Sequence, residues 1–287
     1  MTPQRDPTAV VAWLAGNARR HPGIAVGALV LAIMVLVAAA APWIAPRDPS
    51  QIAPLQRLQP PGAGFWFGAD LIGRDVFSRT VHGARISILV GLAVAATSLS
   101  VGLLIGLLSG FVRWVDALLM RVMDGLMAIP SILLAVALIA LTGASLGNVI
   151  IAISVAEVPR VARLVRSVVL SIREQPFVEA AVVAGTRFPL LLWRHVLPNT
   201  LAPLLVQGTF IFASAVLTEA ILSFIGAGTP PSIPSWGNII AEGRVVFQFA
   251  PHIVLFPGLA LSLMVLAVNL LGDGLRDALD PRFVSRA

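Results

Sequence analysis

A stretch of 27 residues, from Ile86 to Val112, carries no charged side chain. A helix needs about 20 mostly apolar residues to cross the hydrocarbon core of a bilayer. Comparable runs cover Ile24–Ala41, Asn199–Thr218 and His252–Leu271. With 57% hydrophobic and 12% charged residues, the chain is too apolar for an ordinary soluble domain. We therefore expect an all-α integral membrane protein.

Two less regular segments bring the predicted number of transmembrane helices to six. A third span is expected at about 118–141, where Arg121 and Asp124 stand at i, i+3 and can neutralise each other. A fourth starts near Val149 and runs through three Arg residues at every third position, which favours a cytoplasmic end and one shared helix face. The first span, at Ile24–Ala41, is expected to stay uncleaved because its apolar core is longer than that of a signal peptide.

The segment 226–250 fits neither a span nor a free loop. It is too irregular to cross the membrane and too apolar to lie in water, so whether it re-enters the membrane is left open. Trp236, Phe247 and Phe249 within it are typical of the aromatic belt at a membrane interface.

The basic residues restrict both chemistry and topology. The chain has no Cys, which excludes disulfides and thiolate metal sites, and its 20 basic residues are all Arg. Because a P-loop requires a Lys, this chain cannot supply that type of ATP site, and any ATP-driven work, with its ATP and Mg²⁺, would belong to partner subunits. We expect no cofactor and no metal in this chain itself. Placing both termini in the cytoplasm puts 14 of the 20 Arg residues there. That distribution follows the positive-inside rule. It accounts for the net charge of +6 without nucleic-acid binding.

A polar, charged island at 174–203 interrupts the apolar runs and would lie in the cytoplasm. It contains Glu179-Ala180-Ala181, then Gly185, then Val196-Leu197-Pro198-Asn199. Alanines favour a helix and let a partner approach closely, Gly185 permits a sharp exit, and Pro198 restarts a rigid direction into the next span. The island therefore predicts a short helix that touches something soluble.

These motifs resemble the EAA loop of ABC-importer permeases. Other pieces, including FGADLIGRDVFSR, LSFIGAG, PSWGNII and NLLGDGLRDALDPR, are similar to the dipeptide/oligopeptide importer permeases, C-type subunit, over about 67–282. The resemblance implies an ABC type-1 (MetI-like) bundle with a cytoplasmic coupling helix, in a bacterial inner membrane. It also implies a heterodimer with a second permease, two ATP-binding subunits and an extracytoplasmic solute-binding protein. The coupling loop, about 174–200, would include Glu179, Ala180, Ala181, Gly185, Val196 and Pro198.

On this reading the chain divides into three parts. Residues 1–84 hold the cytoplasmic N-terminus, the first helix and an extracytoplasmic loop, 85–274 the permease domain, and 275–287 a cytoplasmic tail. The function implied is import of di- or oligopeptides by alternating access, without a catalytic site in this chain. Candidates for the translocation path are Glu157, beside Pro159, together with Gln207 and Glu219, because polar groups at membrane depth tend to be functional.

Several alternatives remain open. The same importer class carries nickel, glutathione or other small solutes, and an ion-coupled secondary transporter would use Glu157 and Glu219. Gly143-Ala-Ser145-Leu-Gly147 matches a hydrolase nucleophile motif, but Gly and Ser between two apolar helices favour a turn. Asp70 and Asp75 are expected to cap turns and pair with Arg74 or Arg79. Glu157 is expected to pair with Arg160.

Overall fold

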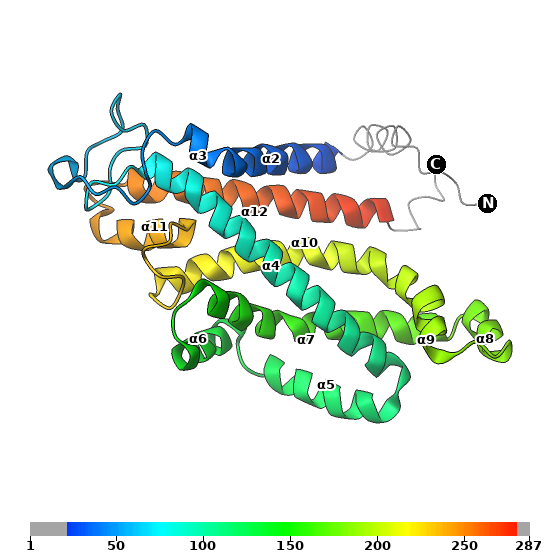
Figure 1. Cartoon of the computed structure of the whole chain (residues 1–287). Coiled ribbons are helices and arrows are strands. Elements are labelled where there is room, and N and C mark those ends of the chain that lie inside the picture. The colour runs from blue at the N-terminus through cyan, green and yellow to red at the C-terminus, as the bar shows by residue number, and fades with distance from the viewer. Residues whose placement is uncertain (1–21, 280–287) are drawn as a thin grey trace.

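The protein is described here by a computed structural model, which covers residues 22–279 (Figure 1). The predicted N-terminal segment 1–21 and the end of the predicted tail, 280–287, lie outside the described residues. Every regular element in the described range is helical, which confirms the all-α prediction. The α-helices are Pro22–Ala39 (α2), Ala41–Ile44 (α3), Val76–Phe111 (α4), Arg113–Met127 (α5), Ser131–Thr142 (α6), Leu146–Arg173 (α7), Pro176–Val183 (α8), Phe188–Leu191 (α9), Leu197–Phe224 (α10), Trp236–Gly243 (α11) and His252–Leu279 (α12). Short turns add Pro54–Gln56 (η1), Leu192–Val196 (η2) and Arg244–Val246 (η3).

The long helices form a bundle whose two ends differ in character. The start of α2, the end of α12, and α8 with α9 lie at one end, whereas the loop 45–75 and α11 lie at the other (Figure 1). Helices α2 and α12 pack antiparallel, because Gly27 faces the Ala267 carbonyl and Gly274 faces Ile24. The predicted coupling loop is therefore at the same end as the first and last described residues.

Glycines on α4 form a closely packed seam with α7. A Cβ built on Gly102 would lie 2.5 Å from Val161 Cβ, and one on Gly106 would lie 2.5 Å from Val165 Cβ. Gly102 and Gly106 form a G-x-x-x-G motif, which permits this close packing of the two helices. The contacts advance in the same direction along both helices, so α4 and α7 run parallel and cross the same layer.

Four described helical segments are long and apolar enough to cross a membrane: Pro22–Ala39, Val76–Phe111, Phe188–Phe224 and His252–Ala278. The third span expected at about 118–141 is not one continuous helix, since α5 and α6 meet at 92°. The bend lies at Pro130, which has no N–H to continue the helix and disfavours helical geometry in the residue before it. This bent pair would count as a fifth span. Helix α7 has the length of a span but carries Glu157 and four Arg residues.

Salt bridges attach α5 to α7. Arg163 Nη2 lies 2.6 Å from Asp124 Oδ1, and Arg166 Nη2 lies 2.7 Å from Asp116 Oδ2. The expected pairing of Asp124 with Arg121 is therefore wrong: the partner of Asp124 is 39 residues away on a neighbouring helix. The three regularly spaced Arg residues of α7 do not all pair with α5, because Arg160 pairs with Glu157 of α7 itself.

Acidic residues stabilise the loop that precedes α4, as predicted. Asp75 is the N-cap of α4, and its side chain accepts a hydrogen bond from the Ser78 backbone N–H at 2.8 Å. Asp70 Oδ2 lies 2.7 Å from Arg79 Nη1 and 2.6 Å from Arg74 Nε. Both Arg side chains also contact Glu242 on α11, which ties this loop to the end of the bundle.

Helix α11 is packed inside the bundle end. The Trp236 side chain is only 1% exposed, and its indole N–H donates to the Thr80 carbonyl at 2.9 Å. The prediction of an interfacial Trp236 is therefore wrong, because this indole fills a gap against α4 where Gly83 leaves room. Phe249 is 84% exposed, and Phe247 is exposed as well, as an interfacial side chain would be.

Candidate functional site

Helix α8 is short and has defined ends. Pro176 occupies its first turn, where a missing N–H is tolerated, and the helix ends at Val183. Gly185 follows with φ +76°, a left-handed conformation that favours glycine. The sequence predicted both the short helix and the sharp exit at Gly185.

One face of α8 is anchored and the other is free. Val178 is buried, and Ala181 packs against the hydrophobic core. Glu179, Ala180 and Val182 are exposed, and Val183 is 84% exposed. An apolar patch beside one carboxylate therefore points away from the bundle at this end.

The chain re-enters the bundle without the break predicted at Pro198. Helix α9, the π-helical turn η2 and α10 follow one another directly, so the helical stretch begins at Phe188 and not at Asn199. Pro198 is the second residue of α10 and lies inside this helical stretch, directly after the π-helical turn η2. Val196 is fully buried and fixes this turn against the core.

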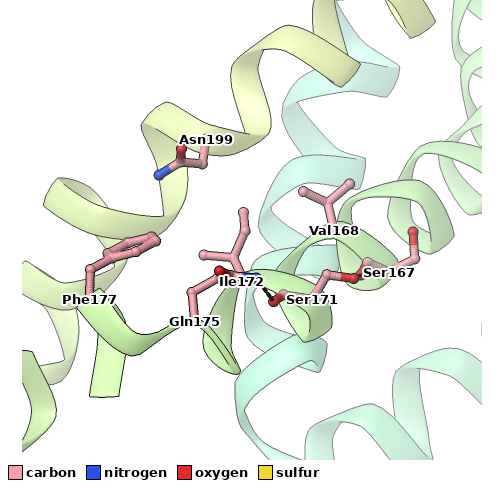
Figure 2. A pocket seen from close by; sticks show the side chains of 7 residues that line it. All are labelled: Ser167, Val168, Ser171, Ile172, Gln175, Phe177 and Asn199. Carbon is pink, nitrogen blue, oxygen red and sulfur yellow. Dashed lines mark hydrogen bonds between the residues drawn. The ribbon is translucent and has the colours of Figure 1, made fainter. Parts of the chain in front are cut away.

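A hollow of about 470 Å³ opens between the end of α7, the start of α8 and the start of α10. Figure 2 shows Phe177 and Asn199 on one side of it and Ser167, Val168 and Ser171 on the other. Four of its seven lining residues carry a hydroxyl or an amide.

A second hollow, of about 440 Å³, continues the first along the same two helices. Its lining includes Leu164 of α7, Gln207 and Phe210 of α10, and Arg276 of α12. The α7 positions 160, 164, 167 and 171 recur at helical spacing and so share one face. The α10 positions 199, 203, 207, 210 and 214 do the same opposite them. We call the space between these two faces the α7–α10 groove.

An ion pair lies at the far end of the groove from α8. Glu157 is buried and accepts from Arg160 Nη1 at 2.7 Å, which confirms the predicted pair. Ser214 of α10 donates to the other Glu157 oxygen at 3.1 Å. Because both carboxylate oxygens have partners, burial of Glu157 is compensated. The groove thus joins two of the predicted path residues, Glu157 and Gln207.

Glu219, the third predicted path residue, lies elsewhere. It is fully buried, and its Oε1 accepts from the hydroxyls of Ser223, Thr229 and Ser235 at 2.9, 3.2 and 2.9 Å. Ser235 is also the N-cap of α11. Glu219 therefore joins α10 to α11 and lines neither hollow of the groove.

Ser145 has a structural role in the turn before α7. It is the N-cap of that helix and accepts from the Asn148 backbone N–H at 3.1 Å. Asn148 in turn donates to the carbonyls of Thr142 and Gly143 at 2.9 Å. The turn interpretation of this segment is confirmed.

Two family models match the chain. Residues 98–285 match the model described as "Binding-protein-dependent transport system inner membrane component". Residues 17–61 match the "N-terminal TM domain of oligopeptide transport permease C". The chain belongs to the binding-protein-dependent inner membrane permease family.

Relatives match the permease over nearly its full length. A probable peptide ABC transporter permease of Sinorhizobium fredii is 55% identical over 92% of this chain and 91% of its own. The dipeptide transport system permease of Alkalihalophilus pseudofirmus is 42% identical over 99% of this chain and 94% of its own. A glutathione transport system permease of Pectobacterium atrosepticum is 39% identical over 93% and 89%.

A solved structure shares the fold. A chain of the MetNI methionine ABC transporter, in an inward-facing conformation, superposes with a TM-score of 0.58 at 21% identity, covering 70% of this chain and 96% of its own. The permease thus has the type-1 ABC importer fold and is a multi-pass inner membrane subunit that works with further membrane and ATPase subunits. The ion-coupled secondary transporter is not favoured.

Proposed function

We propose that this chain is the C-type permease subunit of an ABC importer for di- or oligopeptides. The proposal of a peptide cargo rests on the 55% identity to a probable peptide permease. It is supported by the 42% identity over 99% of the chain to a dipeptide permease. Glutathione is itself a small peptide, so the glutathione permease at 39% identity fits the same cargo class.

The exposed face of α8 is the proposed docking element for an ATPase subunit. Its patch combines Glu179 and Ala180 with Val182 and Val183 on a helix held from behind by Ala181. Small residues allow close approach, and the left-handed Gly185 turns the chain away so that the patch stays free. Val196 and Pro198 hold the return of the loop into the bundle.

The proposed translocation path is the α7–α10 groove. Helix α8 is connected to α7 by a two-residue turn and to α10 through α9 and η2. ATPase closure that moves α8 would therefore change the separation of the two helices that form the groove. This coupling supplies the two access states that alternating access requires.

The proposed complex has a second, homologous permease, two ATPase subunits and an extracytoplasmic binding protein. In the proposed orientation, the bundle end with α8 and the ends of α2 and α12 is cytoplasmic, and the end with α11 is extracytoplasmic. The charge distribution of the loops supports this arrangement.

Reconstitution tests the proposal. The chain would be purified with its partner permease and ATPases, placed in liposomes with ATP inside, and supplied with binding protein and a labelled dipeptide, glutathione or Ni²⁺. We expect ATP-dependent uptake of the peptides and none of Ni²⁺. Uptake of Ni²⁺ but no peptide would refute the cargo, and peptide uptake without ATP would refute the class.

A further inference from the structure

Arg160 lies deep within the membrane-crossing layer. Its neighbour Val161 packs against Gly102, which is close to the middle of the uncharged stretch 86–112 of α4. Since α4 is long and apolar enough to cross a membrane and α7 runs parallel to it, Arg160 lies at the depth of the middle of α4 and not at the cytoplasmic end that its spacing had indicated. A charged side chain at such depth is costly unless it serves a site or faces a water-filled path.

Arg160 also keeps free hydrogen-bonding capacity. Within the described part of the chain, its guanidinium makes one hydrogen bond, from Nη1 to Glu157. Its side chain is 51% exposed, and residue 160 shares the groove face of α7 with Leu164. The Nε and Nη2 edge of the guanidinium is therefore available to a ligand in the groove.

The next two Arg residues of α7 provide the contrast. Arg163 and Arg166 have partners on α5, Asp124 and Asp116, so their charge is used to hold two helices together. Arg160 instead pairs with Glu157 on its own helix, so its guanidinium does not connect α7 to another helix.

The groove is suited to an anion. Among the described residues that line its two hollows, Arg276 contributes a positive charge and Gln207 an amide, and none is a carboxylate; Glu157 and Arg160 lie beyond these linings, at the end of the groove. A planar guanidinium edge fits a carboxylate with two parallel hydrogen bonds, and such charge-assisted pairs are strongest away from bulk water.

We propose that Arg160 binds the C-terminal carboxylate of a peptide as it passes through the groove, and that Glu157 is a positioning residue that orients the guanidinium. This inference rests on the proposed peptide cargo. Glu157 also offsets part of the positive charge, which limits how tightly a carboxylate is held. A transport site requires such moderation, because the cargo must leave as readily as it enters.

A double variant separates this role from a structural one. Arg160→Gln removes the ligand contact and leaves the buried Glu157 unpaired, whereas Glu157→Gln with Arg160→Gln removes both charges and keeps a neutral pair. Arg163→Gln is the matched control, since it removes a charge of similar exposure from the same helix. ATP-driven uptake of a labelled dipeptide by the reconstituted complex is measured at limiting loaded binding protein, with subunit co-purification as the assembly check.

We expect uptake to fall about 10-fold or more in both Arg160→Gln and the double variant, with assembly and ATPase activity retained. The free energy of a hydrogen bond to a charged group corresponds to a change of about this size. Arg163→Gln should keep uptake within about twofold, as expected for an exposed ion pair. Wild-type uptake in the double variant would overturn the proposal and show that Arg160 only neutralises Glu157. Loss of co-purification with the second permease in Arg160→Gln and in the double variant would overturn it in favour of a subunit contact.

If the double variant does not fold, a further single variant still tests the proposal. Arg160→Lys keeps Glu157 paired but lacks the planar edge, so uptake should still fall several-fold; unchanged uptake would overturn bidentate binding. The two proposals also fail differently. If the wild-type complex imports no carboxylate-bearing peptide, the proposed cargo and the Arg160 site both fall. If it imports peptide and the Arg160 variants do too, only the Arg160 site falls.

Discussion

At the scale of single residues, the glycines of α4 determine how closely α7 can approach. A Cβ on Gly106 would meet Val165 Cβ at 2.5 Å and the Ala162 carbonyl oxygen at 2.8 Å, and the backbone oxygen cannot rotate away. We predict that Gly106→Ala lowers the free energy of unfolding by about 1–3 kcal/mol through overpacking. Thermal unfolding in detergent measures it. Gly125→Ala on α5 is the control, because nothing lies within 4 Å of its Cβ; equal losses in both variants would contradict the seam.

Glu219 acts as a shared acceptor for three hydroxyls. We predict that Glu219→Ala lowers the unfolding free energy by about 1–3 kcal/mol, because Ser223, Thr229 and Ser235 lose their partner in a buried site. Glu219→Gln keeps an amide oxygen in the same place and should retain most of the stability. Protease resistance of the α10–α11 connection measures the local effect. If Gln were as damaging as Ala, the charge and not the acceptor geometry would matter.

Sequence reasoning succeeded at residues whose partners are near in sequence. Asp75 accepts from the backbone N–H three positions on, Glu157 pairs with Arg160, and the segment around Ser145 forms the predicted turn. It failed where the partner is distant: Asp124 selects Arg163, and Trp236 is buried against Thr80. Local spacing predicts caps and helix-turn pairs, but it does not say which helix lies alongside.

At the scale of elements, α8 is the proposed docking element for the ATPase subunit. We predict that Val183→Asp prevents stable binding of the ATPase subunit and abolishes uptake, because it puts a charge into the centre of an apolar contact. Val183 is 84% exposed, so the fold of the permease itself should not change. Co-purification of the ATPase is the measurement.

The same substitution at the other end of the bundle is the control. Val245 in η3 is 75% exposed, so Val245→Asp should leave ATPase binding as in the wild type. Intact ATPase binding with Val183→Asp would place the docking surface elsewhere.

The element boundaries show where the sequence was informative. Apolar runs correctly indicated α2, α4, α10 and α12. The bend between α5 and α6 was missed although Pro130 marks it, because a proline in an apolar span can also be accommodated as a kink. Ser167, Ser171 and Gln175 form a polar row at four-residue spacing that could have indicated a wet helix face. That this row faces α10 is a tertiary fact that no local pattern contains.

At the scale of the whole molecule, the orientation in the membrane follows from which end carries α8. The absence of native Cys permits single-cysteine labelling without background. We predict that Leu55→Cys, at a fully exposed position, reacts with a membrane-impermeant maleimide added to spheroplasts. Ala184→Cys, exposed at the opposite end, should react only after the membrane is opened. The reverse pattern would invert the proposed topology.

The placement of α8 between α7 and α10 has a mechanical consequence. The two helices that would receive the motion of the ATPase are the same two that border the proposed cargo route, so force needs no relay through the remaining helices. A displacement of α8 would therefore move α7 and α10 along their whole length. A cross-link between α7 and α10 should then stop both the passage of cargo and the ATPase-driven movement of these helices.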